Sequence, residues 1–244
     1  MSQPHLLLLP GLACDEGVWK HQARALSRIA QVRIADYGSS DSIEKMALRA
    51  TQAAPERFAL AGHSMGGRIA FEIMRRMGGR VTKLAVLDTA YRGWVPGEAG
   101  ERERAERLRL VDLARSQGMR VMAQSWVQYM VHRMRLSDAA LIDRIVEMFD
   151  RKSPEIFVKQ IKALLERPDA TAVLGGIGCP TLVLCGREDA WSTLSTHREI
   201  AALVPKSKFV AIQDCGHMST MERPEEVTEA MTEWLCGGDV DARD

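Results

Sequence analysis

The stretch Phe58-Ala-Leu-Ala-Gly62-His-Ser64-Met-Gly66-Gly67 joins a short apolar run to a segment with helical periodicity. The run that begins at Phe58 is typical of a buried strand. The apolar residues that follow the glycines recur at the spacing of one helix face: Ile69, Ala70, Ile73, Met74 and Met77. A strand, a tight glycine-rich turn and a helix are therefore predicted, and Gly78 and Gly79 are expected to end the helix.

The turn itself carries the pattern Gly-x-Ser-x-Gly, which is weak evidence when it stands alone. Between a strand and a helix it is stronger, because such a turn lifts the hydroxyl of Ser64 clear of the sheet edge. Side chains at positions 62 and 66 would collide across so sharp a turn, which accounts for Gly62 and Gly66. We predict that Ser64 is a nucleophile; a helix N-cap serine is the plainer alternative.

Further apolar runs outside this stretch are also typical of strands, and helical segments lie between most of them. The alternation predicts an α/β fold, with a mostly parallel sheet of about six strands flanked by helices. Between residues 96 and 175 it breaks into four successive helical stretches. We predict a core of residues 1–95 and 176–244 and a helical lid, residues 96–175, inserted after the fourth strand. The six expected strands are His5–Leu9, Val32–Ala35, Phe58–Gly62, Leu84–Leu87, Thr181–Leu184 and Phe209–Ile212.

The candidate base and acid follow two of these strands. His217 comes just after the run that ends at Ile212, and Asp189 just after the run that ends at Leu184. A serine hydroxyl needs a base to take its proton, and the base needs an orienting partner. Both residues fall at carboxyl ends of strands, where a parallel sheet gathers its functional loops. Glu188 and Asp88 compete with Asp189 for the role of the acid.

Two backbone N–H groups are expected to stabilise the oxyanion of a tetrahedral intermediate. One belongs to Met65, the residue after the serine. The other is predicted at Leu12, in the loop Leu9-Pro-Gly-Leu12 after the first strand, where Gly11 lets the backbone turn close to the site.

Four motifs together resemble the lid-bearing α/β-hydrolase superfamily, close to its small carboxylesterases. They are Leu9-Pro-Gly-Leu12, Gly62-His-Ser-Met-Gly-Gly67, Gly186-Arg-Glu-Asp189 and Gly216-His217. In the first motif, Pro10 stands where a histidine is common. The resemblance implies two-step ester hydrolysis through an acyl-enzyme on Ser64, with His217 as general base and no metal or organic cofactor.

The substrate is expected to be a small to medium, mainly apolar carboxylic ester, bound between the sheet edge and the lid. A carbon–carbon bond hydrolase or lactonase, and a ligand sensor with a slow triad, are the alternatives. Met and aromatic residues at helical spacing in the lid are also typical of packing between lid and core, so both interpretations stay open. The expected pocket residues are Trp126, Tyr129, Met130, Trp191 and Met218.

Helix starts are marked twice within the insertion. Ser137 is expected to cap one helix. Ser153, followed by Pro154, is expected to cap the next.

Charge and cysteine content narrow the partners. Lys and Arg number 33 against 32 for Asp and Glu, so a net charge of +1 gives no reason to expect nucleic acid or a membrane. The five cysteines are an odd set without the spacing of a zinc site or a disulfide framework. We expect a cytoplasmic protein that is a monomer or a homodimer.

Overall fold

The computed structural model of the protein describes residues 3–237 and contains one six-stranded sheet. All strand pairings are parallel, in the order β2-β1-β3-β4-β5-β6. The predicted α/β-hydrolase fold with about six strands is confirmed, and each apolar run is a strand to within a few residues at its ends. The strands are β1 (His5–Leu9), β2 (Gln31–Ile34), β3 (Phe58–His63), β4 (Val81–Leu87), β5 (Thr181–Gly186) and β6 (Ser207–Ile212).

The inner strands of the sheet, β1, β3, β4 and β5, are largely buried, as expected of a parallel sheet covered on both faces. Every residue of β3 and of β5 is buried. The register pairs His63 at the end of β3 with Leu87 at the end of β4. The loops that leave these strands therefore start side by side at one edge of the sheet.

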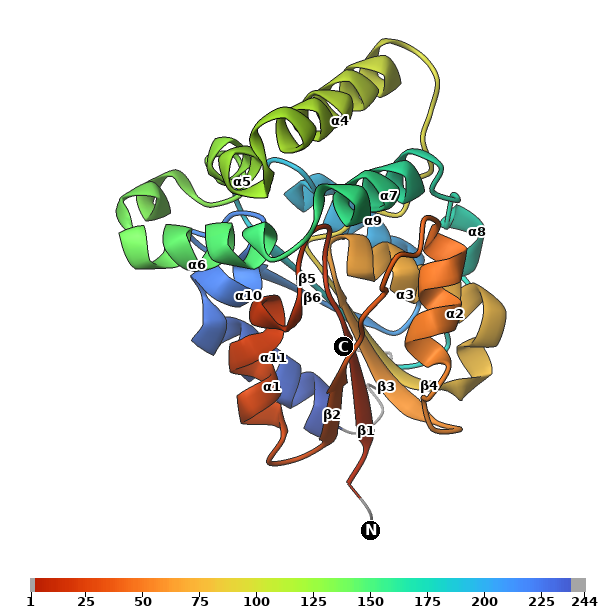
Figure 1. Cartoon of the computed structure of the whole chain (residues 1–244). Coiled ribbons are helices and arrows are strands. Elements are labelled where there is room, and N and C mark those ends of the chain that lie inside the picture. Colours follow the sequence, from red (N-terminus) through yellow and green to blue (C-terminus); the bar gives the residue numbers. More distant parts are fainter. Residues whose placement is uncertain (1–2, 238–244) are drawn as a thin grey trace.

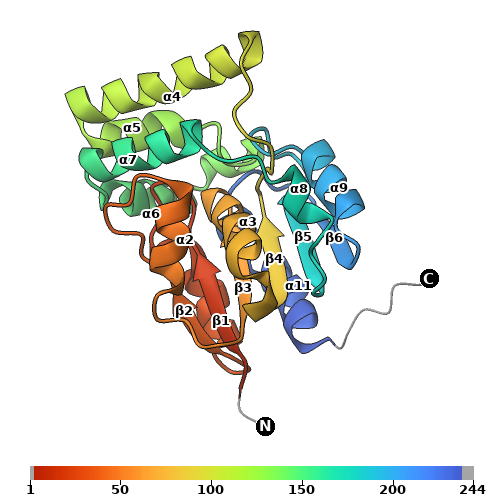
Figure 2. The same cartoon turned by 90° about the vertical axis from the view of Figure 1, so that its right-hand side faces the viewer.

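Helices cover both faces of the sheet (Figures 1 and 2). On one face α1 (Lys20–Leu26) packs against α11 (Pro224–Cys236). On the other face α2 (Ile43–Thr51) packs against α3 (Met65–Met77), and α9 (Leu194–Leu203) covers β5 and β6. As predicted, α3 ends immediately before Gly78. Short helical turns complete the core: η1 (Glu16–Trp19), η2 (Gly78–Arg80) and α10 (Ser219–Glu222).

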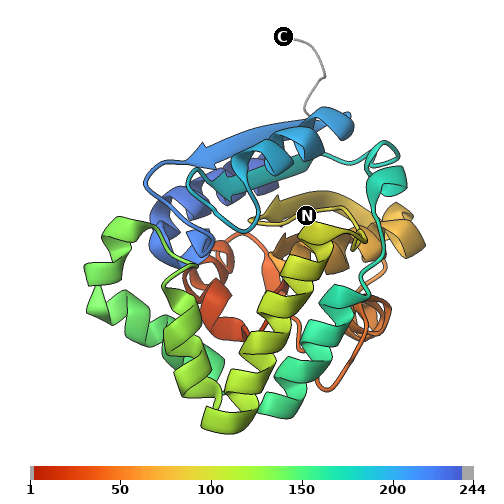
Figure 3. The same cartoon turned by 90° about the horizontal axis from the view of Figure 1, so that it is seen from above.

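A helical segment between β4 and β5 lies over the carboxyl ends of the strands (Figure 3). Ser153 caps one of its helices as predicted, because its side chain accepts from the N–H of Ile156 at 3.3 Å. The prediction for Ser137 is wrong: Asp138 caps the following helix by accepting from the N–H of Leu141 at 3.1 Å. The segment holds α4 (Glu98–Gln117), α5 (Met119–Val127), η3 (Arg133–Ser137), α6 (Ala139–Asp150), α7 (Pro154–Leu165) and α8 (Thr171–Leu174).

Helix length and hydropathy bear on membrane association. Within residues 3–237, none of the helices combines the length and the apolar character that a bilayer crossing requires.

Candidate active site

Ser64 lies on the sharp turn between β3 and α3. Its backbone has φ 54° and ψ −117°, a conformation that non-glycine residues rarely adopt and that is found at functional sites. The turn is held on both sides: the Ser64 N–H donates to the Leu87 carbonyl at 2.9 Å, and the Thr89 hydroxyl donates to the Ser64 carbonyl at 2.7 Å. The surrounding structure thus fixes the hydroxyl at the rim of the sheet.

The two glycines flanking Ser64 are required by close backbone contacts. A Cβ atom on Gly62 would overlap the backbone of Gly66, and one on Gly66 would overlap the carbonyl of Leu9. No side chain fits at either position without moving the backbone. For Gly62 the obstacle is the other side of the turn, as expected from the sequence, whereas for Gly66 it is the backbone at the end of β1.

Three loops far apart in the chain bring Ser64, His217 and Asp189 together. His217 Nε2 lies 2.8 Å from Ser64 Oγ, and His217 Nδ1 lies 2.8 Å from Asp189 Oδ2. His217 and Asp189 are both buried, whereas Ser64 is partly accessible. Such a chain can move a proton from the hydroxyl to the imidazole while the carboxylate orients the ring.

The carboxylate of Asp189 is also fixed on its other side. Oδ1 accepts from the backbone N–H groups of Trp191 at 2.8 Å and Ser192 at 2.9 Å. Burial by itself would raise the pKa of Asp189, but His217 and these hydrogen bonds outweigh it and hold the pKa below its ordinary value of 3.8. Asp189 is therefore an ionised acceptor at neutral pH.

The two competing acids, Asp88 and Glu188, lie near the active site, but neither is hydrogen-bonded to the His217 ring, which pairs with Asp189; Asp88 lies 3.4 Å from the ring of His63 instead. The Asp88 carboxylate accepts from the Gly186 N–H at 2.9 Å and from the hydroxyl and N–H of Ser219. Glu188 accepts from the Cys215 N–H at 3.1 Å. Both carboxylates stabilise the loop that carries His217.

Two further buried residues that the sequence did not single out for this purpose hold the same loop. Glu222, on α10, accepts from the N–H groups of Gly216 and Met218 and also from that of His132, at 2.7 Å, in the helical segment. The His63 Nε2 lies 2.9 Å from the His217 carbonyl, so this ring points away from the serine hydroxyl. In the sequence, Glu222 is marked for this role by its position five residues after His217.

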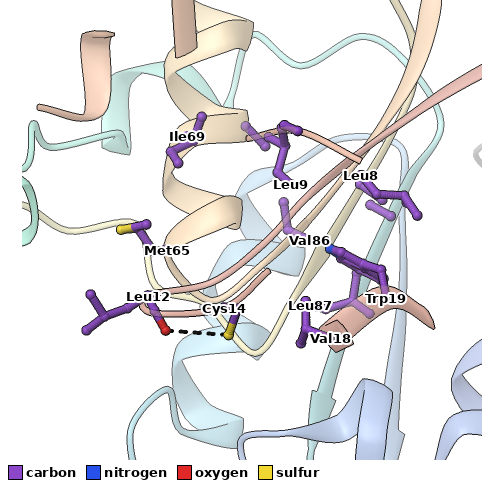
Figure 4. Close-up of a cluster of buried hydrophobic side chains, with 14 of the residues drawn as sticks. Leu8, Leu9, Leu12, Cys14, Val18, Trp19, Met65, Ile69, Val86 and Leu87 are labelled. Atoms are coloured by element: carbon purple, nitrogen blue, oxygen red, sulfur yellow. Dashed lines mark hydrogen bonds between the residues drawn. The ribbon is translucent and has the colours of Figure 1, made fainter. Parts of the chain in front are cut away.

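The expected oxyanion donors lie beside the serine. Leu12 and Met65 both line the same cavity as Ser64, and a Cβ on Gly11 would lie 3.2 Å from the Ser64 Cβ. Within residues 3–237 neither the Leu12 nor the Met65 N–H has a protein acceptor. Figure 4 shows the loop packed into the core, with the Cys14 thiol donating to the Leu12 carbonyl at 3.4 Å.

A cavity of about 360 Å³ opens above Ser64 and His217. Trp126 and Trp191, two of the five expected pocket residues, line it and meet edge to face with ring centroids 5.9 Å apart. Trp126 also stacks on Phe149 of α6, at 5.3 Å. The tryptophan therefore both lines the cavity and packs the helical segment together.

The other three expected pocket residues, Tyr129, Met130 and Met218, do not line this cavity, which corrects the expectation for them. Helix α5 ends at Val127, so the helical spacing of the Met and aromatic residues does not extend to Tyr129, which is 65% exposed. Met130 and Met218 are buried in the core. Met130 instead helps to position His217 through its backbone, since the Met130 carbonyl accepts from the His217 N–H at 2.8 Å.

The cavity lining is more highly charged than a mainly apolar substrate would require. Four arginines and three glutamates stand in the lining, and they come from α3, α4, α9 and the loops after β4 and α7. Charge runs on helices are usually solvated faces, so the charge pattern of α4 by itself does not indicate that Arg107 lines a cavity. The charged lining residues are Arg68, Arg92, Glu103, Glu106, Arg107, Arg167 and Glu199.

In the described part of the chain, no group of three or more His, Cys, Asp or Glu side chains is arranged to hold a metal ion.

The sequence also matches a known protein family. The sequence model of the alpha/beta hydrolase family matches residues 6–230, nearly the whole chain. The chain belongs to this family, and it is a hydrolase of the esterase type.

Individual relatives resemble the chain at low identity. A pimeloyl-[acyl-carrier protein] methyl ester esterase of Nitrosomonas europaea is 23% identical over 233 residues, covering 91% of this chain and 92% of that protein. A thermophilic esterase from Thermogutta terrifontis superposes with a TM-score of 0.85 at 29% identity, over 96% of this chain and 90% of its own. The enol-lactonase from Burkholderia xenovorans gives 0.84 at 22% identity, over 96% and 92%, and shows a shared fold.

Proposed function

We propose that this chain is a carboxylesterase that cleaves its substrate through an acyl-enzyme on Ser64. The observation that carries the proposal is the continuous hydrogen-bonded chain from Ser64 Oγ through the His217 ring to Asp189, with 2.8 Å at each step. Its open end faces a cavity large enough for a small molecule.

The reaction follows from the proton path. The Ser64 oxygen attacks the ester carbonyl as His217 Nε2 takes the hydroxyl proton, and the N–H groups of Leu12 and Met65 donate to the developing oxyanion. His217 then gives the proton to the leaving alcohol. Water then enters, loses a proton to His217 and attacks the acyl carbonyl. The bond from the acyl carbon to Ser64 Oγ breaks, His217 returns the proton to Oγ, and the acid leaves. Asp189 stays ionised throughout and stabilises the imidazolium.

The helical segment, residues 96–175, acts as the lid of this site in our proposal. Its side chains supply one wall of the cavity, while the strand ends supply the floor. The lid residues in the lining are Glu103, Glu106, Arg107, Trp126, Leu164 and Arg167.

Labelling with a serine-directed phosphonate, followed by mass spectrometry, tests the nucleophile. We expect the modification on the peptide that holds Ser64 and turnover of p-nitrophenyl acyl esters that continues beyond one acyl group per chain. Labelling of another residue would refute the assignment, and a burst without further turnover would favour a ligand sensor. Because a lactone is a cyclic ester, lactones belong in the same panel.

A further inference from the structure

Three arginines lie around one side of the active-site cavity. Arg68 projects from α3, four residues after Ser64, while Arg107 comes from α4 and Arg167 from the loop after α7. All three line the same cavity as the serine and the imidazole. We call Arg68, Arg107 and Arg167 the arginine cluster.

Three glutamates also line the cavity, and none of them forms a hydrogen bond with Arg68 in the described part of the chain. Glu103 binds Arg167 through two parallel hydrogen bonds of 2.8 Å and also accepts from Arg107. Glu199 binds Arg92 at 3.0 Å. Glu106 is exposed and acts on Arg107 only through space. Arg107 and Arg167 therefore share the carboxylate of Glu103, and Arg68 takes no part in these hydrogen bonds.

Arg68 is the cation without a matching anion. Its guanidinium donates to the Arg92 carbonyl at 2.8 Å, and among the residues that the structure describes it has no carboxylate within ion-pair distance. Burial, together with the positive charges of Arg167 and Arg107, lowers the pKa of Arg68 to about 9, and the negative charges of Glu103 and Asp169 oppose this only in part. The group is still a cation at neutral pH, and its free energy would fall if an anion entered the cavity.

We propose that the arginine cluster binds a free carboxylate on the substrate, with Arg68 as its main contact. This inference rests on the proposed esterase function and names its substrate class: half-esters of short dicarboxylic acids. A planar guanidinium binds a carboxylate through two parallel N–H donors, which fixes orientation as well as position. Since Arg68 follows Ser64 by about one helical turn, the bound carboxylate would direct the ester at the other end of a short chain to the serine. The free carboxylate takes no part in the bond changes.

Selectivity between a half-ester and a diester tests the proposal. Monomethyl glutarate carries the free carboxylate, and dimethyl glutarate has the same carbon chain without it; methanol release measures kcat/KM for each. We expect the wild-type protein to prefer the half-ester. In Arg68→Met the ratio of the two kcat/KM values should fall about 10- to 100-fold, the usual range for a charge-assisted hydrogen bond.

Two further variants provide controls. Arg68→Lys keeps the charge and loses the two-pronged geometry, so it should retain part of the preference. Arg102→Met removes an arginine on the exposed face of α4, where it pairs with Glu98, and should leave the ratio within about twofold of wild type. A wild-type protein without preference for the half-ester, or an unchanged ratio in Arg68→Met, would overturn the proposal.

A binding measurement separates this inference from the esterase proposal. Calorimetry with monomethyl glutarate on Ser64→Ala protein reports carboxylate binding without turnover, and adding Arg68→Met should weaken the Kd about 10- to 100-fold. An equal Kd in both proteins, or no binding to the Ser64→Ala protein, defeats the carboxylate site. Retained hydrolysis in Ser64→Ala would instead defeat the esterase mechanism, whatever the Kd values are.

Discussion

The two sides of the active-site cavity differ in how their polar groups are satisfied. On the serine side, the Asp189 carboxylate has three partners within the chain, and His217 bridges it to Ser64. On the arginine side, Glu103 pairs with both Arg107 and Arg167, whereas the hydrogen bond of Arg68 within residues 3–237 goes to a backbone carbonyl. The chain thus supplies hydrogen-bond partners for the side chains that we assign to the reaction, whereas the guanidinium of Arg68 is available to a ligand.

This difference is physically reasonable. Groups that react must be held in position before the substrate arrives, because preorganised hydrogen bonds cost no rearrangement during the reaction. A group that recognises the substrate gains most when its partner arrives with the ligand. The following predictions test the serine side, and the experiments on Arg68 test the other.

Ser64→Ala should have the largest effect. Removing the hydroxyl leaves His217 with no nucleophile to activate, so kcat for ester hydrolysis should fall about 10⁴- to 10⁶-fold. Circular dichroism and the thermal midpoint should stay close to wild type, since among the described residues Ser64 Oγ is hydrogen-bonded to His217 alone. A folded variant that keeps a tenth of the activity would remove Ser64 from the mechanism.

Asp189→Asn should lower kcat by about a thousandfold to ten-thousandfold, because an amide favours the wrong imidazole tautomer. Asp88→Asn is the matched comparison at a neighbouring strand end. Asp88 binds Gly186 and Ser219 and does not contact the imidazole of His217, so its loss should lower kcat by about tenfold or less and instead reduce the free energy of unfolding by about 1.5–3 kcal/mol. If the two variants exchanged these effects, the acid that orients His217 would be Asp88, which follows β4, and not Asp189.

Glu222→Gln should have an intermediate effect on activity. Its carboxylate accepts from three backbone N–H groups around His217, and an amide nitrogen facing one of these donors would loosen the loop. We expect kcat to fall by about tenfold with KM little changed, together with a lower thermal midpoint. Glu229→Gln, on the exposed side of α11, should match wild type in both measurements.

The smallest expected effect concerns how the stability contributed by Asp189 depends on pH. The pKa of Asp189 is lowered in the folded protein, so its ionised form contributes stability at neutral pH that is lost as pH falls from the ordinary value of 3.8 through the lower folded value. The difference in thermal midpoint between wild type and Asp189→Asn should therefore narrow between about pH 5 and pH 2. A difference that stays constant over this interval would contradict the stabilising pairing with His217.

The fold was predictable because each local signal agreed with the next. Six apolar runs alternating with helical periodicity define a parallel sheet, and the glycines around Ser64 are explained by the contacts of the turn. Errors occurred where local signals competed. Two adjacent residues could cap α6, and Asp138 took the role expected of Ser137. The stripe that should have reached Tyr129 stopped at Val127.

By itself, the sequence determined the class of the protein and named the residues that the fold brings together at Ser64. Those residues lie at strand ends, and parallel strands deliver their carboxyl ends to one edge whatever the helices above them do. The charged lining of the cavity was decided by tertiary structure alone. Whether an arginine on a helix faces water or a cavity depends on how the helices between β4 and β5 pack, and sequence periodicity carries no information about what lies opposite the polar face.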